Sequence, residues 1–192
     1  MKKLLLAGLI SSLTLLQGCA GVIVAGAAGT ASVAGDGRSV AVQMNDESIE
    51  SKAYNAIKAD LPLYQSSRIA VIAYNGNVLL VGQTPNSQYK SQVENMVKNI
   101  DGVRRVFSEI RLSKPISLSK QSTDSWITTK VKSLLLDTPE IASLRIKVVT
   151  EDAEVFLIGL VTEKESNKAV EVARHVNGVK QVIKVFEYIP EK

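Results

Sequence analysis

From residue 46 onward, apolar positions alternate between the spacing of a helix and the spacing of a strand. Helical spacing predicts two helices with one buried face each, formed by Ile49, Ala53, Ala56 and Ile57 in the first and by Ile127, Val131, Leu134 and Leu135 in the second. Two strand-like runs follow each helix, at 68–74 and 78–84 and again at 145–150 and 154–161. A second helix and a last strand then complete each set.

Turn residues mark the ends of these predicted elements. Asn75-Gly76-Asn77 predicts a hairpin between the first two strands, and Glu151-Asp152-Ala153 joins the corresponding strands of the second set. Gly102 and Gly178 each follow a helix, at a position where a left-handed backbone favours glycine. Both sets therefore have the order αββαβ. This order predicts an α+β fold in which two helices cover one face of a small three-stranded mixed sheet.

The two sets are copies of one unit. Val78–Gly82 overlays Val155–Gly159 at a shift of 77 positions, and the neighbouring segments overlay at shifts of 76 to 78. So stable a register indicates two homologous domains, at 46–112 and 123–190, joined by a linker at 113–122. Because a domain of fewer than about 70 residues has a marginal core, we expect the two domains to pack against each other.

Residues 1–18 have the features of a secretory signal peptide. Lys2 and Lys3 precede an apolar stretch, 4–16, that is too short to span a bilayer, since a spanning helix needs roughly 20 residues. The segment Leu16-Gln17-Gly18-Cys19 resembles a bacterial lipobox, in which the cysteine is acylated and becomes the first residue. An ordinary signal peptide with a chance cysteine is the alternative. Because Cys19 is the only cysteine, no internal disulfide competes with lipidation.

Residues 19–45 contain the candidate acylated cysteine and a stretch rich in Gly, Ala and Ser. This composition has neither helical nor strand periodicity and predicts a tether between the lipid and the first domain. An alternative is that Val22–Val33 rests on the bilayer surface. Two or more acyl chains would anchor the protein stably, whereas a single chain gives marginal binding.

The composition excludes several classes of function. The chain has one His, His175, and one Cys, whereas a zinc site needs three or four ligands and a nucleophilic triad normally needs a His. The net charge is +4, and without Lys2 and Lys3 the count is 21 basic against 19 acidic residues. We therefore expect no nucleic-acid binding, no catalytic residues, no cofactor and no metal. The acidic segment 151–154 is typical of a solvated hairpin tip rather than a cation site.

The repeated motifs support a family resemblance. Both units have Val-x-Leu-x-Gly in the second strand and Gly-Val before the third, and in these respects they resemble BON domains. With the lipobox and tether, the mature chain resembles the dual BON-domain outer-membrane lipoproteins of the division- and stress-associated lipid-binding type. Ala20, rather than Asp, follows Cys19. The resemblance thus implies an anchor in the inner leaflet of a Gram-negative outer membrane, facing the periplasm, with enrichment at the division site left open.

The same resemblance implies a role in outer-membrane integrity, no enzymatic activity, and binding of anionic phospholipid by the second BON domain. In that family the lipid-binding helix is the first helix of this domain, and Trp126 matches the Trp at its start. Independently, helical geometry places apolar side chains on the solvent side of this helix, with hydroxyls between them and lysines at the margins. This combination is typical of interfacial membrane contacts. The candidate phospholipid-binding residues are Trp126, Thr129, Lys130, Lys132, Ser133 and Leu136.

The first copy provides an internal comparison. At a shift of 78 positions, Ser48 and Lys58 replace the Trp and Leu of the second copy, so we expect only the second copy to suit a bilayer. The expected ligand is an anionic lipid, phosphatidylglycerol or cardiolipin, and we expect a monomer. Two alternatives remain. The same face of Trp126 and Leu136 would also suit an adaptor that docks onto an outer-membrane assembly or division machine, or Trp126 packs beneath the linker or the neighbouring domain.

Overall fold

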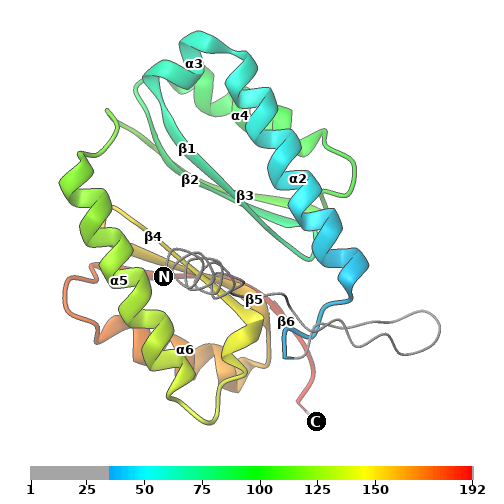
Figure 1. Ribbon diagram of the computed structural model, residues 1–192, viewed down its shortest axis with the longest axis vertical. Helices are drawn as coiled ribbons and strands as arrows, with labels where there is room; N and C mark the ends of the chain where they lie inside the picture. Colours follow the sequence, from blue (N-terminus) through cyan, green and yellow to red (C-terminus); the bar gives the residue numbers. More distant parts are fainter. Residues whose placement is uncertain (1–34, 192) are drawn as a thin grey trace, which may run out of the picture. The chain divides into compact units, whose positions relative to one another are not determined.

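The computed structural model describes residues 35–191 (Figure 1). The predicted signal peptide, Cys19 and most of the predicted tether lie outside these residues. The first domain contains helices α2, α3 and α4 and strands β1–β3: α2 Val40–Ala59, α3 Leu61–Ser66, β1 Arg68–Tyr74, β2 Asn77–Thr84, α4 Ser87–Lys98 and β3 Arg105–Leu112. The second domain contains α5 Leu118–Leu136, the 3-10 turn η2 Ser143–Arg145, β4 Ile146–Glu151, β5 Glu154–Val161, α6 Glu163–Arg174 and β6 Gln181–Tyr188.

Both sheets have the predicted mixed topology. In each domain the first two strands pair antiparallel and the last strand pairs parallel to the middle one. The glycine of the Val-x-Leu-x-Gly motif has a steric role, because a Cβ on Gly82 would collide with the carbonyl oxygen of Arg68. A Cβ on Gly159 would collide in the same way with the carbonyl of Arg145. The repeated glycine therefore permits the close approach of neighbouring backbones at the start of each hairpin.

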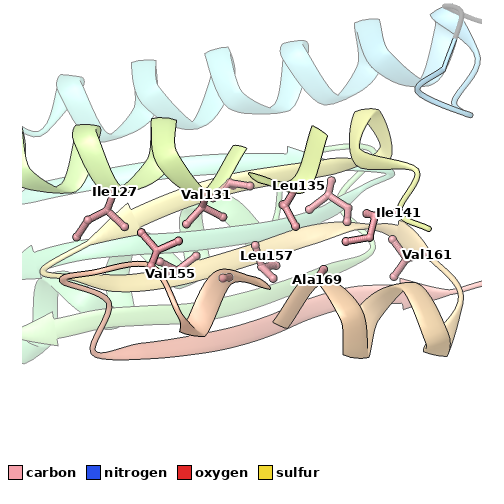
Figure 2. Packing of buried hydrophobic residues seen from close by; sticks show 12 residues of the cluster. Ile127, Val131, Leu135, Ile141, Val155, Leu157, Val161 and Ala169 are labelled. Atoms are coloured by element: carbon pink, nitrogen blue, oxygen red, sulfur yellow. The ribbon is translucent and has the colours of Figure 1, made fainter. Parts of the chain in front are cut away.

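Each domain has its own apolar core between the helices and one face of the sheet. In the first domain, α2 and α4 cover β1–β3, and in the second, α5 and α6 cover β4–β6 (Figure 1). Figure 2 shows Ile127, Val131 and Leu135 pointing from α5 toward Val155 and Leu157 of the sheet. The α+β fold with two αββαβ units is thus confirmed.

The opposite faces of the two sheets pack against each other, as expected for two small domains. The shared cluster of buried side chains consists of Tyr74, Leu79, Val81, Phe156, Ile158 and Val185. Ion pairs surround it, including those of Arg68 with Glu151 and Lys147 with Glu50. Because this packing occupies the second face of each sheet, the outward faces of the helices are the main surfaces left for binding.

A buried aspartate stabilises the hairpin turn of each domain. The carboxylate of Asp46 accepts hydrogen bonds from the backbone N–H groups of Asn75 and Gly76, at 2.7 and 2.8 Å. The carboxylate of Asp124, at the equivalent position in α5, accepts two bonds of 2.8 Å from the N–H groups of Asp152 and Ala153. Ala153 has a φ of 67°, which an alanine rarely adopts, so the two bonds hold a turn that its own sequence disfavours.

Both leading helices begin earlier than their apolar periodicity predicts. Helix α2 begins at Val40, with Ser39 as its N-cap, six residues before the predicted boundary at 46. Helix α5 begins at Leu118, capped by Ser117, five residues before the predicted boundary at 123, so half of the predicted linker is helical. The first turns of both helices contact little of the sheet. They therefore lack the apolar spacing by which a helix is found in a sequence.

Candidate functional site

Helix α5 has one buried face and one solvent-exposed face. Its buried residues, among them Ile127, Val131 and Leu135, lie against the second domain's sheet (Figure 2). On the opposite side, Trp126 is 52% exposed and Leu136 is 61% exposed. Trp126 is therefore not enclosed beneath the linker or the first domain. The other four predicted residues, Thr129, Lys130, Lys132 and Ser133, are also exposed, so α5 presents all six to solvent.

The exposed face is longer than the sequence indicated, because Leu118 belongs to it. Leu118 is 79% exposed and lies 18 positions before Leu136, which is five full turns or about 27 Å along the axis. We call the surface that these two leucines delimit, with Trp126, Thr129 and Ser133 between them, the outer face of α5. Leu118 was not predicted to belong to this face because the apolar spacing places the start of the helix after residue 122. Ser117, a good N-cap after Pro115, was the available signal.

Three hydroxyl groups on the exposed side of α5 form hydrogen bonds within the helix. Thr129 and Ser125 each donate a hydrogen bond of 2.9 Å to the carbonyl one turn earlier, that of Ser125 and Gln121 respectively. Ser122 donates in the same way to the carbonyl of Leu118, at 3.1 Å. Because these three hydroxyl groups already have a hydrogen-bond partner, they can leave water without becoming unsatisfied donors. Its small side chains can lie close to an apolar surface between the larger Trp and Leu groups.

Two lysines flank the outer face without a partner of opposite charge. Lys120 pairs with Asp152 at 2.7 Å, but no carboxylate of residues 35–191 lies within 4 Å of the amine of Lys130 or Lys132. Both side chains are solvent-exposed. Their charges are therefore available to an external anion, and their alkyl stems can extend along an apolar surface.

Helix α2 differs from α5 on the equivalent face, although less completely than expected. Ser48 and Lys58 occupy the positions of the Trp and Leu, but Met44 and Tyr54 are exposed, so the α2 surface also carries apolar groups. The Tyr54 ring stacks edge-on against Tyr64 of α3, at 6.3 Å between centroids. Tertiary packing against α3 explains this aromatic residue, whereas no aromatic ring among the described residues stacks on the indole of α5. Helix α2 also exposes Glu47, which would repel an anionic surface.

The chain enters the first domain through a cluster of charged and aromatic side chains. The guanidinium of Arg38 binds both carboxylate oxygens of Asp36, at 2.7 and 2.8 Å, and also donates to Asp46 at 2.6 Å. Its Cζ lies 3.8 Å from the centre of the Tyr74 ring. We call this group the entry cluster. It has no counterpart in the second domain, where Ile116 occupies the position equivalent to Arg38.

The contacts of the entry cluster lower the pKa of Asp36. Burial by itself would raise the pKa of this carboxyl, but the hydrogen bond and charge of Arg38 hold the pKa below its ordinary value of 3.8. Since the folded pKa is the lower one, this carboxylate stabilises the fold above about pH 4, and its contribution is lost as the pH falls toward the folded pKa. Carboxyl NMR should therefore give a midpoint below 3.8 for Asp36. In the Arg38→Met variant, where burial remains and the guanidinium is gone, the midpoint should lie above 3.8; an unchanged midpoint would contradict the assignment.

Other candidates for chemistry do not form a site in the described part of the chain. The carboxylates of the acidic hairpin each have a basic partner: Glu151 pairs with Arg68, Asp152 with Lys120, and Glu154 with Arg111. The hydrogen bond from Lys120 lowers the pKa of Asp152. His175 is exposed and its Nδ1 lies 2.7 Å from the carbonyl oxygen of Glu171. Within residues 35–191, no cluster of His, Cys, Asp and Glu is arranged to hold a metal ion.

Comparison with known proteins identifies the family. Residues 45–114 and 123–190 match the BON domain model. The chain is 40% identical to Outer membrane lipoprotein DolP of Haemophilus influenzae over 184 residues, which span 96% of this chain and 95% of that protein. It is 44% identical to a 21 kDa hemolysin of Actinobacillus pleuropneumoniae over 155 residues, 80% of this chain and 79% of that one. It is also 29% identical to Osmotically-inducible protein Y of Escherichia coli over 142 residues, covering 72% of this chain and 70% of that protein.

None of the described helices is both long and apolar enough to cross a bilayer. Two tandem αββαβ domains, both matched by the BON model, follow a lipobox-like segment near the N-terminus. The relative that is named as an outer-membrane lipoprotein aligns with nearly the whole length of this chain. This chain therefore belongs to the family of outer-membrane lipoproteins with two BON domains.

Proposed function

We propose that this lipoprotein binds anionic phospholipid through the outer face of α5, in the second BON domain, and thereby supports outer-membrane integrity. The acyl chains on Cys19 would hold the protein in the inner leaflet, facing the periplasm. The observation that carries the proposal is the half-exposed indole of Trp126, which lies between two exposed leucines. Beside it are two lysines that have no ion-pair partner among residues 35–191. The proposed activity is non-enzymatic recognition of a lipid surface.

The expected energies assign different roles to the anchor and to α5. Partial burial of Trp126 and Leu136 in the membrane interface contributes about 2–4 kcal/mol, and Leu118 adds about 1 kcal/mol. Lys130 and Lys132 add about 1 kcal/mol each near an anionic surface. This total corresponds to weak association of the unanchored domains. An acyl anchor would keep the domains near the membrane at an effective concentration of roughly millimolar. The acyl chains would then hold the protein at the membrane, while α5 would set its orientation and its lipid preference.

The substitution Trp126→Glu tests the proposal. Residues 32–192 form one compact unit with three apolar clusters, so a fragment of this length keeps the entry cluster and the whole of α2. The wild-type fragment should float with vesicles that contain phosphatidylglycerol at low salt. The variant should lose at least tenfold in vesicle affinity, because it loses apolar burial and adds a charge that the surface repels. The indole is half exposed, so the melting temperature should hardly change.

A matched control is Tyr54→Glu, which places the same charge on an exposed aromatic position of α2. This variant should float like wild type. Binding of the wild-type fragment should also weaken steeply between low and physiological salt, because part of the attraction is between surface charges. The proposal fails if Trp126→Glu floats like wild type. A discrete protein crosslinked from position 126 in detergent, with salt-insensitive binding, would instead indicate an adaptor.

A further inference from the structure

A small apolar groove lies next to the C-terminal end of the outer face of α5. It has a volume of about 210 Å³ and runs between the last turn of α5 and the 3-10 turn η2. Its buried lining residues are Leu135, Ile146 and Val148, and its exposed ones are Leu136 and Leu144, the latter 59% exposed. Lys132 and the half-buried Ser143 also line it. The groove thus has a mainly apolar lining with one hydroxyl group and one cation, and this cation has no partner carboxylate among residues 35–191.

The chain that leads back to Cys19 passes beside this groove. Gly35, with a φ of 97°, lies so close to Leu144 that a Cβ on it would collide with the leucine Cδ1. A Cβ on Gly37 would lie 3.0 Å from Nε of Arg145. Glycines at both positions therefore let the segment pack against η2 of the second domain.

The entry cluster holds this segment in place. Asp36 accepts two hydrogen bonds from Arg38, whose side chain is only 7% exposed, and the Tyr74 hydroxyl donates to Asp36 at 3.2 Å. Gly35 consequently lies beside the groove, against Leu144. Fifteen residues lie between Cys19 and Gly35, so an acyl anchor on Cys19 would keep Leu144 within about 60 Å of the membrane.

We propose that this groove holds part of one acyl chain of an anionic phospholipid, with Lys132 next to the lipid phosphate. The proposal rests on the proposed function and deepens it, because it adds a site for a single lipid molecule to a surface contact. Hydrocarbon is the ligand that fits, since the buried side chains of the groove have no hydrogen-bonding groups that could pair with a peptide backbone. The groove continues the outer face through Leu136, and the anchored end of the chain leaves beside it.

A lipid that is monomeric in solution distinguishes a single-molecule site from contact with a surface. Fragment 32–192 is titrated with dihexanoyl phosphatidylglycerol below its micelle concentration, while methyl NMR signals are recorded. The signals of Leu136, Leu144 and Ile146 should shift and saturate, and dihexanoyl phosphatidylcholine should bind several-fold more weakly. Leu144→Glu should remove the shifts at Leu136 and Ile146. Absence of saturable shifts at the groove methyls in the wild-type fragment would overturn the proposal.

Leu118→Glu, at the opposite end of α5, is the matched control. It should weaken binding to phosphatidylglycerol vesicles several-fold but leave the shifts caused by the monomeric lipid unchanged; loss of these shifts would contradict the placement of the site. Trp126→Glu separates the two proposals. If Trp126→Glu loses vesicle binding and the groove methyl signals of the wild type do not shift with monomeric lipid, the groove proposal fails and the proposed function stands. If Trp126→Glu binds vesicles like wild type and the groove methyl signals still shift, the proposed role of the outer face fails and the groove remains a site for a single lipid.

Discussion

Replacing Asp46 by alanine is expected to lower the free energy of unfolding by about 3–5 kcal/mol. The substitution removes the acceptor of two backbone N–H groups in the β1–β2 turn, those of Asn75 and Gly76. It also leaves the buried guanidinium of Arg38 with Asp36 as its remaining carboxylate partner. Loss of one partner of a buried ion pair is costly because the other charge stays desolvated. Urea unfolding of fragment 32–192 measures the effect.

The duplicated fold provides the control for this prediction. Asp124 makes the same two bonds to its own hairpin but none to an arginine, so Asp124→Ala should lower the free energy of unfolding by about 2–3 kcal/mol. In an Arg38→Met background, the effect of Asp46→Ala should fall to that of Asp124→Ala. Equal effects of the two alanine substitutions in the wild-type background would show that the entry cluster adds nothing to stability.

The second large effect is expected at the contact between the two sheets. Ile158 is 1% exposed and packs in the shared cluster of both domains. The substitution Ile158→Asp would place a carboxylate among apolar side chains, and Lys147, its cross-strand neighbour, is already paired with Glu50. It should therefore lower the free energy of unfolding by more than about 4 kcal/mol. Because each domain alone has a marginal core, we expect the single cooperative transition of the wild type to separate into two transitions, or the chain to unfold.

Leu136→Asp is the control for a carboxylate in the same domain. Leu136 is 61% exposed, so this substitution should change the free energy of unfolding by less than about 0.5 kcal/mol. Ile158→Ala adds no charge and should lower it by about 2–5 kcal/mol, as other cavity-forming substitutions do. A single unshifted urea transition for Ile158→Asp would mean that the two sheets do not depend on each other for stability.

Much of the fold was predictable because the relevant patterns are local. The alternation of helical and strand spacing predicted both αββαβ units, and Asn75-Gly76 predicted a turn that needs two left-handed residues, which the structure confirms with φ of 52° and 74°. The helix starts were less predictable. Most residues in the first turns of α2 and α5 are exposed, so their sequences lack an apolar period. The hairpin aspartates were also missed, although Asp46 and Asp124 are identical at a shift of 78 positions.

The candidate site was predictable to the extent that it lies on one helix. Helical geometry alone identified Trp126 and Leu136 as outward residues, and both are more than half exposed. Leu118 was missed because of the misplaced helix start. The exposed Tyr54 of α2 was unexpected, and its edge-on contact with Tyr64 depends on α3, which the sequence pattern did not predict.

The sequence by itself determined the class of fold, its duplication and the outward stripe of α5, because each of these depends on spacing within a short segment. Only the tertiary structure decided how the parts meet. It packs the second faces of the two sheets together, and it holds Asp36 through Arg38 so that Gly35 lies against Leu144. These contacts join residues up to about a hundred positions apart. Their proximity depends on how two separately patterned domains pack, which no local period of apolar residues encodes.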